Sequence, residues 1–266
     1  MIYTNKIYHV DAFTKKPFKG NPAGVMIIDH SVTETWMQNM AAEMNLSETA
    51  FLLPSDTGFN IRYFTPTHEV PLCGHATLAS AHIVYELGLT SKSKPILFKA
   101  KEANLSVERN NDALVMDFPK YPLTKIATPF QFKNMIGFEP LEVYASSYDW
   151  IIAVANDENE ILSALPDFDL IKKSRLGHLM ITAKSDEDEI DFVVRCFAPS
   201  LGIDEDPVTG SAHCALTPLW AEKLDKKDMH SLQLSKRTGR LQVGLRDNRV
   251  QIMGHAVTIF EASLKI

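Results

Sequence analysis

Two segments of the sequence place a glycine beside residues that bind anions or transfer protons. The first segment is PLCGHAT (71–77) and the second is EDPVTGSAH (205–213). Each glycine precedes an Ala-rich stretch whose apolar residues have helical spacing. The first N–H groups of a helix are unpaired and its dipole is positive at that end, so both attract anions. We therefore expect a small carboxylate substrate to be bound by Cys73, Gly74, Thr209, Gly210 and Ser211.

Three side chains near these segments are candidates for catalysis. Glu48 lies directly before an apolar strand, and a carboxylate buried beside apolar residues becomes a better proton carrier near neutral pH. A solvated glutamate in an exposed turn is the alternative interpretation. We expect His75 to be neutral because the dipole of its helix disfavours a positive charge there. Asp206 precedes the second helical stretch, where it either serves the site or caps the helix.

The two segments belong to a longer internal repeat. RYFTP (62–66) is matched by RCFAP (195–199), an offset of 133 residues. Gly74 and Gly210 are 136 residues apart, so the second loop is three residues longer. Similarity at this distance indicates two domain-sized copies. If the two halves face each other, both glycine segments lie in one cleft.

The patterns in each half predict an α+β fold. Helical spacing of apolar residues predicts helices over 33–45 and after each glycine, with Pro218 straining or kinking the last of them. We expect a curved, mostly antiparallel sheet wrapped around a central helix in each half. Short β-prone runs bounded by turn residues predict strands at 7–13, 23–29, 49–54, 113–119, 150–156, 178–184, 241–246, 249–254 and 256–262.

The boundary between the halves falls in a proline-rich stretch (118–129). We assign residues 1–122 to the first half, completed by the C-terminal strand 256–266, and residues 123–255 to the second half.

Composition excludes several classes of partner. Lys and Arg number 27 against 33 Asp and Glu, a net charge of −6, so we expect neither nucleic-acid nor membrane binding. The N-terminus lacks the pattern of a secretory signal, and no run approaches the ~18 apolar residues of a membrane span. The sequence thus predicts a cytoplasmic protein.

The cysteines raise two further alternatives. Their number, three, does not suggest a disulfide framework, so we expect free thiols. A metal site at Cys73, His75, His213 and Cys214 would have spacings that fit structural zinc poorly, so we expect no metal. A hydrolase using Cys73 and His75 is disfavoured because residues two apart at a helix start rarely face each other.

Four motifs together resemble the PhzF-type, phenazine-biosynthesis-like family of isomerases, whose fold is like that of diaminopimelate epimerase. They are GNPAGV (20–25), SETAF (47–51), RYFTPTHEVPLCGHAT (62–77) and RCFAPSLGIDEDPVTGSAH (195–213). The resemblance implies two similar halves with the active site between them, and isomerisation by proton transfer without a cofactor. It also implies a homodimer. By motif, the catalytic residues of the family fall on Glu48, His75 and Asp206, with Ser211 as the small polar residue and Gly74 and Gly210 as backbone donors.

The sequence departs from the epimerase relatives of this family, which use two cysteines on opposite faces of the substrate. Cys73 precedes the first glycine, but Thr209 precedes the second, and Cys214 lies further along the helix. This pattern disfavours a two-thiol epimerase. A non-catalytic protein that binds small carboxylates and an amino-acid epimerase or racemase are the alternatives. Arg240, in a segment that matches the family only partly, receives no role.

Overall fold

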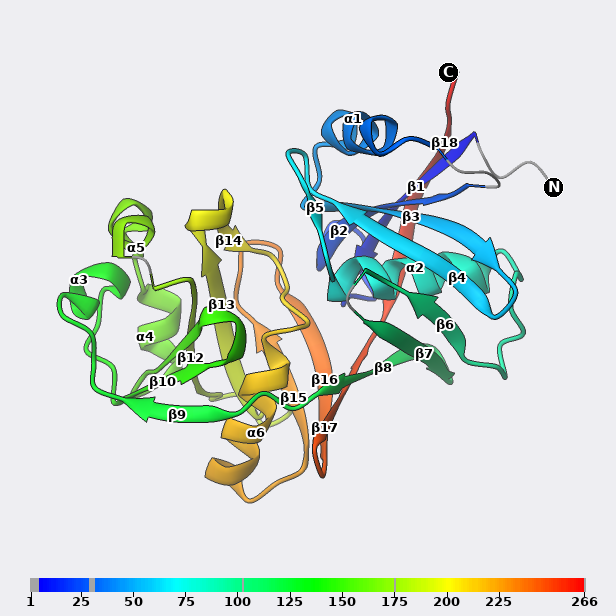
Figure 1. The fold of residues 1–266 in the computed structure, drawn as a ribbon. Coiled ribbons are helices and arrows are strands. Elements are labelled where there is room, and N and C mark those ends of the chain that lie inside the picture. Colours follow the sequence, from blue (N-terminus) through cyan, green and yellow to red (C-terminus); the bar gives the residue numbers. More distant parts are fainter. Residues whose placement is uncertain (1–4, 29–31, 102, 175, 266) are drawn as a thin grey trace. The chain divides into compact units, whose positions relative to one another are not determined.

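The computed structural model describes residues 5–28, 32–101, 103–174 and 176–265. The chain forms two compact units, residues 1–117 with 253–266 and residues 118–252. Colours in Figure 1 follow the chain through both units. Among the described residues, none of the helices has the length and apolar character needed to cross a membrane.

The first unit contains one mixed, mostly antiparallel sheet. Its strands pair in the order β18, β1, β2, β3, β4, β6, β7, β8, with β5 also paired to β4. Only the β2–β3 and β4–β6 pairs of this series are parallel. The strands are β1 (Lys6–Ala12), β2 (Asn21–Ile27), β3 (Glu48–Ser55), β4 (Gly58–Phe64), β5 (Glu69–Val70), β6 (Ile96–Lys99), β7 (Asn104–Asn110), β8 (Ala113–Pro119) and β18 (Ala256–Ser263).

The central helix of this unit, α2 (Gly74–Glu86), lies among the strands (Figure 1) and contacts β1, β2, β3 and β18. All of its residues are buried except His82 and Glu86. A helix that is apolar around nearly its whole circumference needs cover on every side. The small side chains along α2, among them Ala76, Ala79 and Ala81, let the sheet approach closely enough to provide it.

Helix α1 (Glu34–Met44), which also belongs to the first unit, is amphipathic. The Thr33 side chain caps its start by accepting a hydrogen bond from the Trp36 N–H, and Asn45 ends it in the left-handed conformation. Met37 and Met40 are buried in a cluster with residues of β2, β3 and β4. The helix predicted at 33–45 is therefore present.

The second unit repeats the topology of the first. The order β9, β10, β11, β12, β13, β15, β16 has parallel pairs at β11–β12 and β13–β15, and β14 also pairs with β13. The strands are β9 (Leu123–Ile126), β10 (Glu142–Ser146), β11 (Trp150–Val154), β12 (His178–Lys184), β13 (Phe192–Ala198), β14 (Ile203–Asp206), β15 (Asp228–Gln233), β16 (Gly239–Arg246) and β17 (Arg249–Gly254). The helices are α3 (Phe132–Ile136), α4 (Glu158–Ser163), α5 (Phe168–Ser174), α6 (His213–Leu224) and the short 3-10 turns η1 (Ser147–Asp149) and η2 (Pro199–Leu201).

Each unit contains the same type of ion pair at matching positions of the repeat. On β4, Arg62 Nε donates to Glu69 Oε1 at 2.7 Å, and on β13, Arg195 Nε donates to Glu205 Oε1 at 2.7 Å. A duplicated topology with a duplicated side-chain contact confirms the α+β fold of two similar halves.

The helix predicted after Gly210 is present, but it starts later after its glycine than α2 does after Gly74. Helix α6 begins at His213, not directly after Gly210, and residues 210–212 form a turn. The N–H groups of His213, Cys214 and Ala215 donate to the carbonyls of that turn at 3.1 Å. Those three N–H groups are therefore already bonded and are not available to an anion. Pro218 lies inside α6.

Candidate active site

Near the first glycine segment (71–77), three elements of the first unit begin close together. Asn21 begins β2, Glu48 begins β3, and Gly74 begins α2 with Cys73 as its N-cap. Strands β2 and β3 are parallel neighbours, so their first residues share one edge of the sheet. His75, the second residue of α2, is buried there.

His75 is the centre of this group. Its Nε2 lies 3.2 Å from Glu48 Oε2, and the Glu48 side chain is only 13% exposed. Its Nδ1 lies 3.2 Å from Asn21 Nδ2 and 3.4 Å from Cys73 Sγ. The structure thus brings together three of the residues singled out in the sequence, Glu48, Cys73 and His75. Asn21 was not among the candidates, although it stands in the GNPAGV motif.

Burial lowers the pKa of His75 to about 3, so the imidazole is neutral near pH 7. This direction agrees with the expectation of a neutral histidine, and burial is the cause that the structure shows. Because the ring is neutral, its contact with Glu48 is not an ion pair at that pH. Nε2 approaches Oε2 without the alignment of a hydrogen bond and has no hydrogen-bond partner among the described residues.

A second layer of hydrogen bonds holds the start of α2. The Thr77 hydroxyl donates to the Cys73 carbonyl at 2.6 Å, and the Tyr63 hydroxyl lies 2.6 Å from Thr77 Oγ1. Burial raises the pKa of Tyr63, which keeps its proton. No signal in the sequence pointed to Tyr63.

The contact between Cys73 and His75 corrects one argument from the sequence. We expected residues two apart at a helix start to point away from each other. Cys73 has extended backbone angles, φ −144° and ψ 118°, because it is the N-cap and precedes the helix. Helical spacing therefore does not apply to this pair, and the thiol reaches the ring of His75.

Glu48, Cys73 and His75 are also the one group in the described part of the chain with three metal-ligand atoms close together, within 4.8 Å of one another. The carboxylate lies against Nε2 and the thiol against Nδ1, on different edges of the imidazole. An ion bound to one ring nitrogen would therefore need the other ligand to move before it completed a tetrahedral site.

The metal site considered in the sequence at Cys73, His75, His213 and Cys214 is not supported at its two residues in the second unit. His213 Nδ1 lies 3.0 Å from the Thr209 carbonyl and its Nε2 lies 2.9 Å from Ser231 Oγ. Both ring nitrogens are thus engaged in the second unit. Burial lowers the pKa of His213 to about 4 and raises that of Cys214 to about 12.

The second glycine segment (205–213) is held in place by one buried amide side chain, that of Gln233. Gln233 Oε1 accepts from the Thr209 N–H at 2.8 Å, and Gln233 Nε2 donates to the Asp206 carbonyl at 2.7 Å. The Thr209 hydroxyl donates to Asp206 Oδ2. Gly210 is buried and Ser211 is half-buried in the turn that follows. Gln233 was missed in the sequence because it lies on β15, far from any motif.

Arg240, which received no role in the sequence analysis, lies at the surface. It is exposed and forms an ion pair of 3.4 Å with Glu187.

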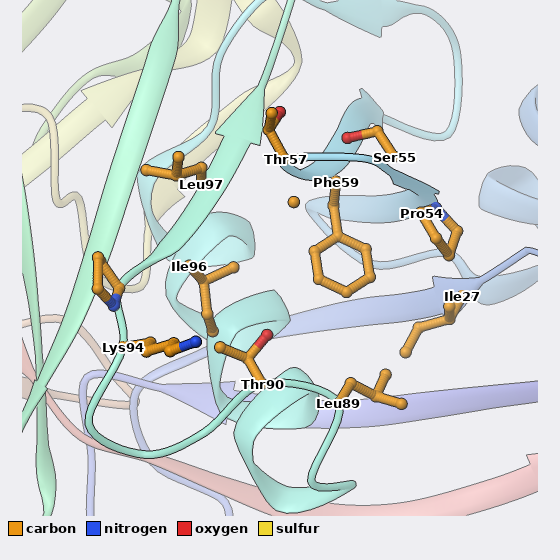
Figure 2. Close-up of a pocket in the computed structure, with 12 residues that line it drawn as sticks. Ile27, Pro54, Ser55, Thr57, Phe59, Leu89, Thr90, Lys94, Ile96 and Leu97 are labelled. Atoms are coloured by element: carbon orange, nitrogen blue, oxygen red, sulfur yellow. The ribbon is translucent and has the colours of Figure 1, made fainter.

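A cavity of about 470 Å³ lies at the far ends of β2 and β3, after the end of α2 (Figure 2). Figure 2 shows Ile27, Phe59, Leu89 and Ile96 around it, with Lys94 and Thr90 at one side. Because Asn21, Glu48 and His75 occupy the opposite ends of the same elements, this cavity is not the candidate site.

Comparison with known proteins agrees with this architecture. The family model described as phenazine biosynthesis-like protein (PhzC-PhzF) matches residues 10–262. An uncharacterised isomerase of Halalkalibacterium halodurans is 44% identical over 262 residues, which cover 98% of each chain. The crystal structure of a PhzF-family phenazine biosynthesis protein from Enterococcus faecalis has a TM-score of 0.94 at 35% identity and covers 98% of this chain and 99% of that one. A predicted epimerase from Pseudomonas aeruginosa, 22% identical with a TM-score of 0.78 over 98% of this chain and 99% of that one, shares the fold.

Proposed function

The chain belongs to the phenazine biosynthesis-like (PhzC-PhzF) family, and we propose that it is an isomerase that moves a proton within a small carboxylic acid without a cofactor. Its relative in Halalkalibacterium halodurans is named an isomerase. The observation that carries the proposal is the carboxylate of Glu48, largely shielded from water, 3.2 Å from a buried neutral histidine at the start of α2.

Glu48 is the proton carrier. Its carboxylate takes a proton from a substrate carbon, and the electron pair of the broken C–H bond moves into an adjacent π-system. The protonated carboxyl then returns the proton to a different carbon, where a new C–H bond forms. No electrons leave the substrate, so the step needs neither an oxidant nor a metal.

The substrate carboxylate lies at the start of α2 in this proposal. The first N–H groups of the helix and its dipole favour a negative charge there, and Cys73 and Gly74 bound the same position. Preorganised donors at this point stabilise the charge that develops when Glu48 removes the proton.

Solvent deuterium incorporation tests the proposal. We expect the protein to exchange carbon-bound hydrogen in at least one member of a panel of small cyclic and amino carboxylic acids in D2O, followed by NMR. Glu48→Gln keeps the size of the side chain but cannot accept the proton, so exchange falls by about 10²- to 10⁴-fold. Folding, followed by circular dichroism, changes little.

Glu43→Gln is the matched control, because Glu43 is an exposed residue of α1. It retains full exchange. If Glu48→Gln exchanges as fast as the unmodified protein on the same acid, Glu48 is not the proton carrier. If the protein binds an acid but exchanges nothing, it is the non-catalytic binder that the sequence left open.

A role for Asp206, Thr209, Gly210 and Ser211 in the same reaction stays a prediction. Asp206→Asn retains the shape of the side chain, and it lowers exchange on the same acid if Asp206 acts on the substrate. A two-thiol epimerase is a weaker alternative, because burial raises the pKa of Cys214 to about 12 and also raises that of Cys196. Neither thiol of the second unit forms a thiolate near pH 7.

A further inference from the structure

Asn21 is the residue of the GNPAGV motif that the catalytic assignment leaves without a role. It is completely buried and begins β2 directly after Gly20. Gly20 has φ +67°, and a Cβ atom built on it would lie 2.0 Å from the Ala12 carbonyl oxygen. Only glycine fits this turn, and the turn sets Asn21 opposite Ala12 at the start of the strand.

The contact between Asn21 and His75 has a defined direction. The Asn21 amide nitrogen lies 3.2 Å from His75 Nδ1. An amide nitrogen donates hydrogen bonds and does not accept them, so Nδ1 is the acceptor. A neutral imidazole carries one proton, and that proton then resides on Nε2.

We propose that Asn21 is a positioning residue that holds neutral His75 in the Nε2–H tautomer, so that the Nε2–H group is presented to a substrate oxygen beside Glu48. Nε2 has no hydrogen-bond partner among the described residues and lies 3.2 Å from Glu48 Oε2. A donor next to the proton carrier stabilises the enolate-like oxygen that forms as Glu48 takes the proton. The opposite tautomer would direct a lone pair toward both the carboxylate and that oxygen.

This inference rests on the proposed function for its chemical meaning, but its structural content can be measured without substrate. The test is an NMR experiment on ¹⁵N-labelled imidazole rings near pH 7, in which the two ring nitrogens report their protonation separately. The sequence contains nine histidines, and the signals of His75 are those that disappear in His75→Gln. We expect an unprotonated Nδ1 and a protonated Nε2.

Asn21→Asp reverses the polarity of the contact at nearly constant shape. A carboxylate accepts where the amide donated, so Nδ1 of His75 gains a proton and its signal moves to the protonated range. Asn60→Asp is the matched control on the exposed part of β4 and leaves the His75 signals unchanged. Exchange of carbon-bound hydrogen in the substrate falls in Asn21→Asp, by about 10- to 10⁴-fold, and not in Asn60→Asp.

A proton on Nδ1 of His75 in the unmodified protein overturns the inference, whether or not Asn21→Asp folds. An Asn21→Asp protein whose Nδ1 stays unprotonated overturns it as well. These outcomes are separate from the test of the proposed function, because exchange that survives in Glu48→Gln removes the catalytic role of Glu48 and leaves the tautomer measurement intact.

Discussion

His75 shows how neighbours decide what a residue can do. The side chains of Glu48, Cys73 and Asn21 lie within 3.4 Å of its ring nitrogens. Burial keeps the ring neutral, so it works as a hydrogen-bond donor and acceptor rather than as a charge. A neutral donor beside a carboxylate suits proton transfer, because a permanent positive charge would hold the carboxylate in its ionised form.

Gln233 holds the loop between Asp206 and Thr209 in the second unit. Replacing it with leucine should therefore lower the stability of the protein. Gln233→Leu removes the acceptor of the Thr209 N–H and the donor to the Asp206 carbonyl. Each polar group left without a partner costs about 1–3 kcal/mol, so for these two groups we expect the free energy of unfolding to fall by about 2–6 kcal/mol. Urea unfolding measures the change.

Gln242→Leu is the control for Gln233→Leu, because Gln242 is exposed on the neighbouring strand β16. Its effect should stay within about 0.5 kcal/mol. Equal stability of the two variants would show that the amide of Gln233 does not hold the loop.

At the scale of elements, the start of α2 is where the first unit gathers its chemistry. The parallel pairing of β2 with β3 puts their first residues at one edge, and α2 begins against them. The rest of α2 is buried by the sheet, and this requires small side chains along its length. Packing around α2 and placement of His75 are therefore consequences of the same close approach.

Ala79→Leu tests this packing. Ala79 is completely buried on α2, so extra methyl groups force side chains or backbone to shift, at a cost of about 1–3 kcal/mol in the free energy of unfolding. Thermal or urea unfolding gives the value. Ala42→Leu, at an exposed position of α1, should leave stability nearly unchanged. If both variants are equally stable, α2 has free space around it.

At the scale of the whole molecule, two buried histidines make stability depend on pH. Among the described residues, the buried histidines are His75 in the first unit and His213 in the second, and burial lowers their pKa to about 3 and about 4. In the unfolded chain both return to about 6.5. The unfolded state therefore binds more protons below that pH, so stability is greatest above about pH 6.5 and falls as the pH drops toward the native values.

We expect each of the two histidines to remove about 1.4 kcal/mol of stability per pH unit in that range, or roughly 2 kcal/mol between pH 6.5 and pH 5. Urea unfolding at several pH values measures the slope. His213→Gln should reduce the slope by about one proton, whatever it does to stability at neutral pH. A slope that is the same in His213→Gln and in the unmodified protein would contradict the assignment of His213 as buried and neutral.

The homodimer implied by the family resemblance is also a property of the whole molecule and stays a prediction. Sedimentation equilibrium should give twice the mass of the chain. A single-chain mass over the whole concentration range would contradict it.

The sequence by itself determined many of the strands, three of the helices, the repeat, and Glu48, Cys73 and His75 of the first cluster. Strands at 113–119, 178–184 and 249–254 follow from local composition, and their predicted bounds coincide with β8, β12 and β17. Glu48 and His75 were found because they stand in motifs, which are local in the chain. Helical spacing did not give the exact start of α6, because the carbonyls of the turn over 210–212 accept from its first N–H groups.

Only the tertiary structure decided how the side chains of the site contact one another. Asn21 and His75 are 54 residues apart. Thr209, in the loop after β14, bonds to Gln233 on β15, 24 residues further along, so no pattern of spacing pairs either couple. The pKa of His75 is lowered by burial, and burial of its ring depends on packing rather than on sequence spacing. Periodicity records which face of an element is buried, whereas the partner of a buried polar atom depends on packing between distant segments.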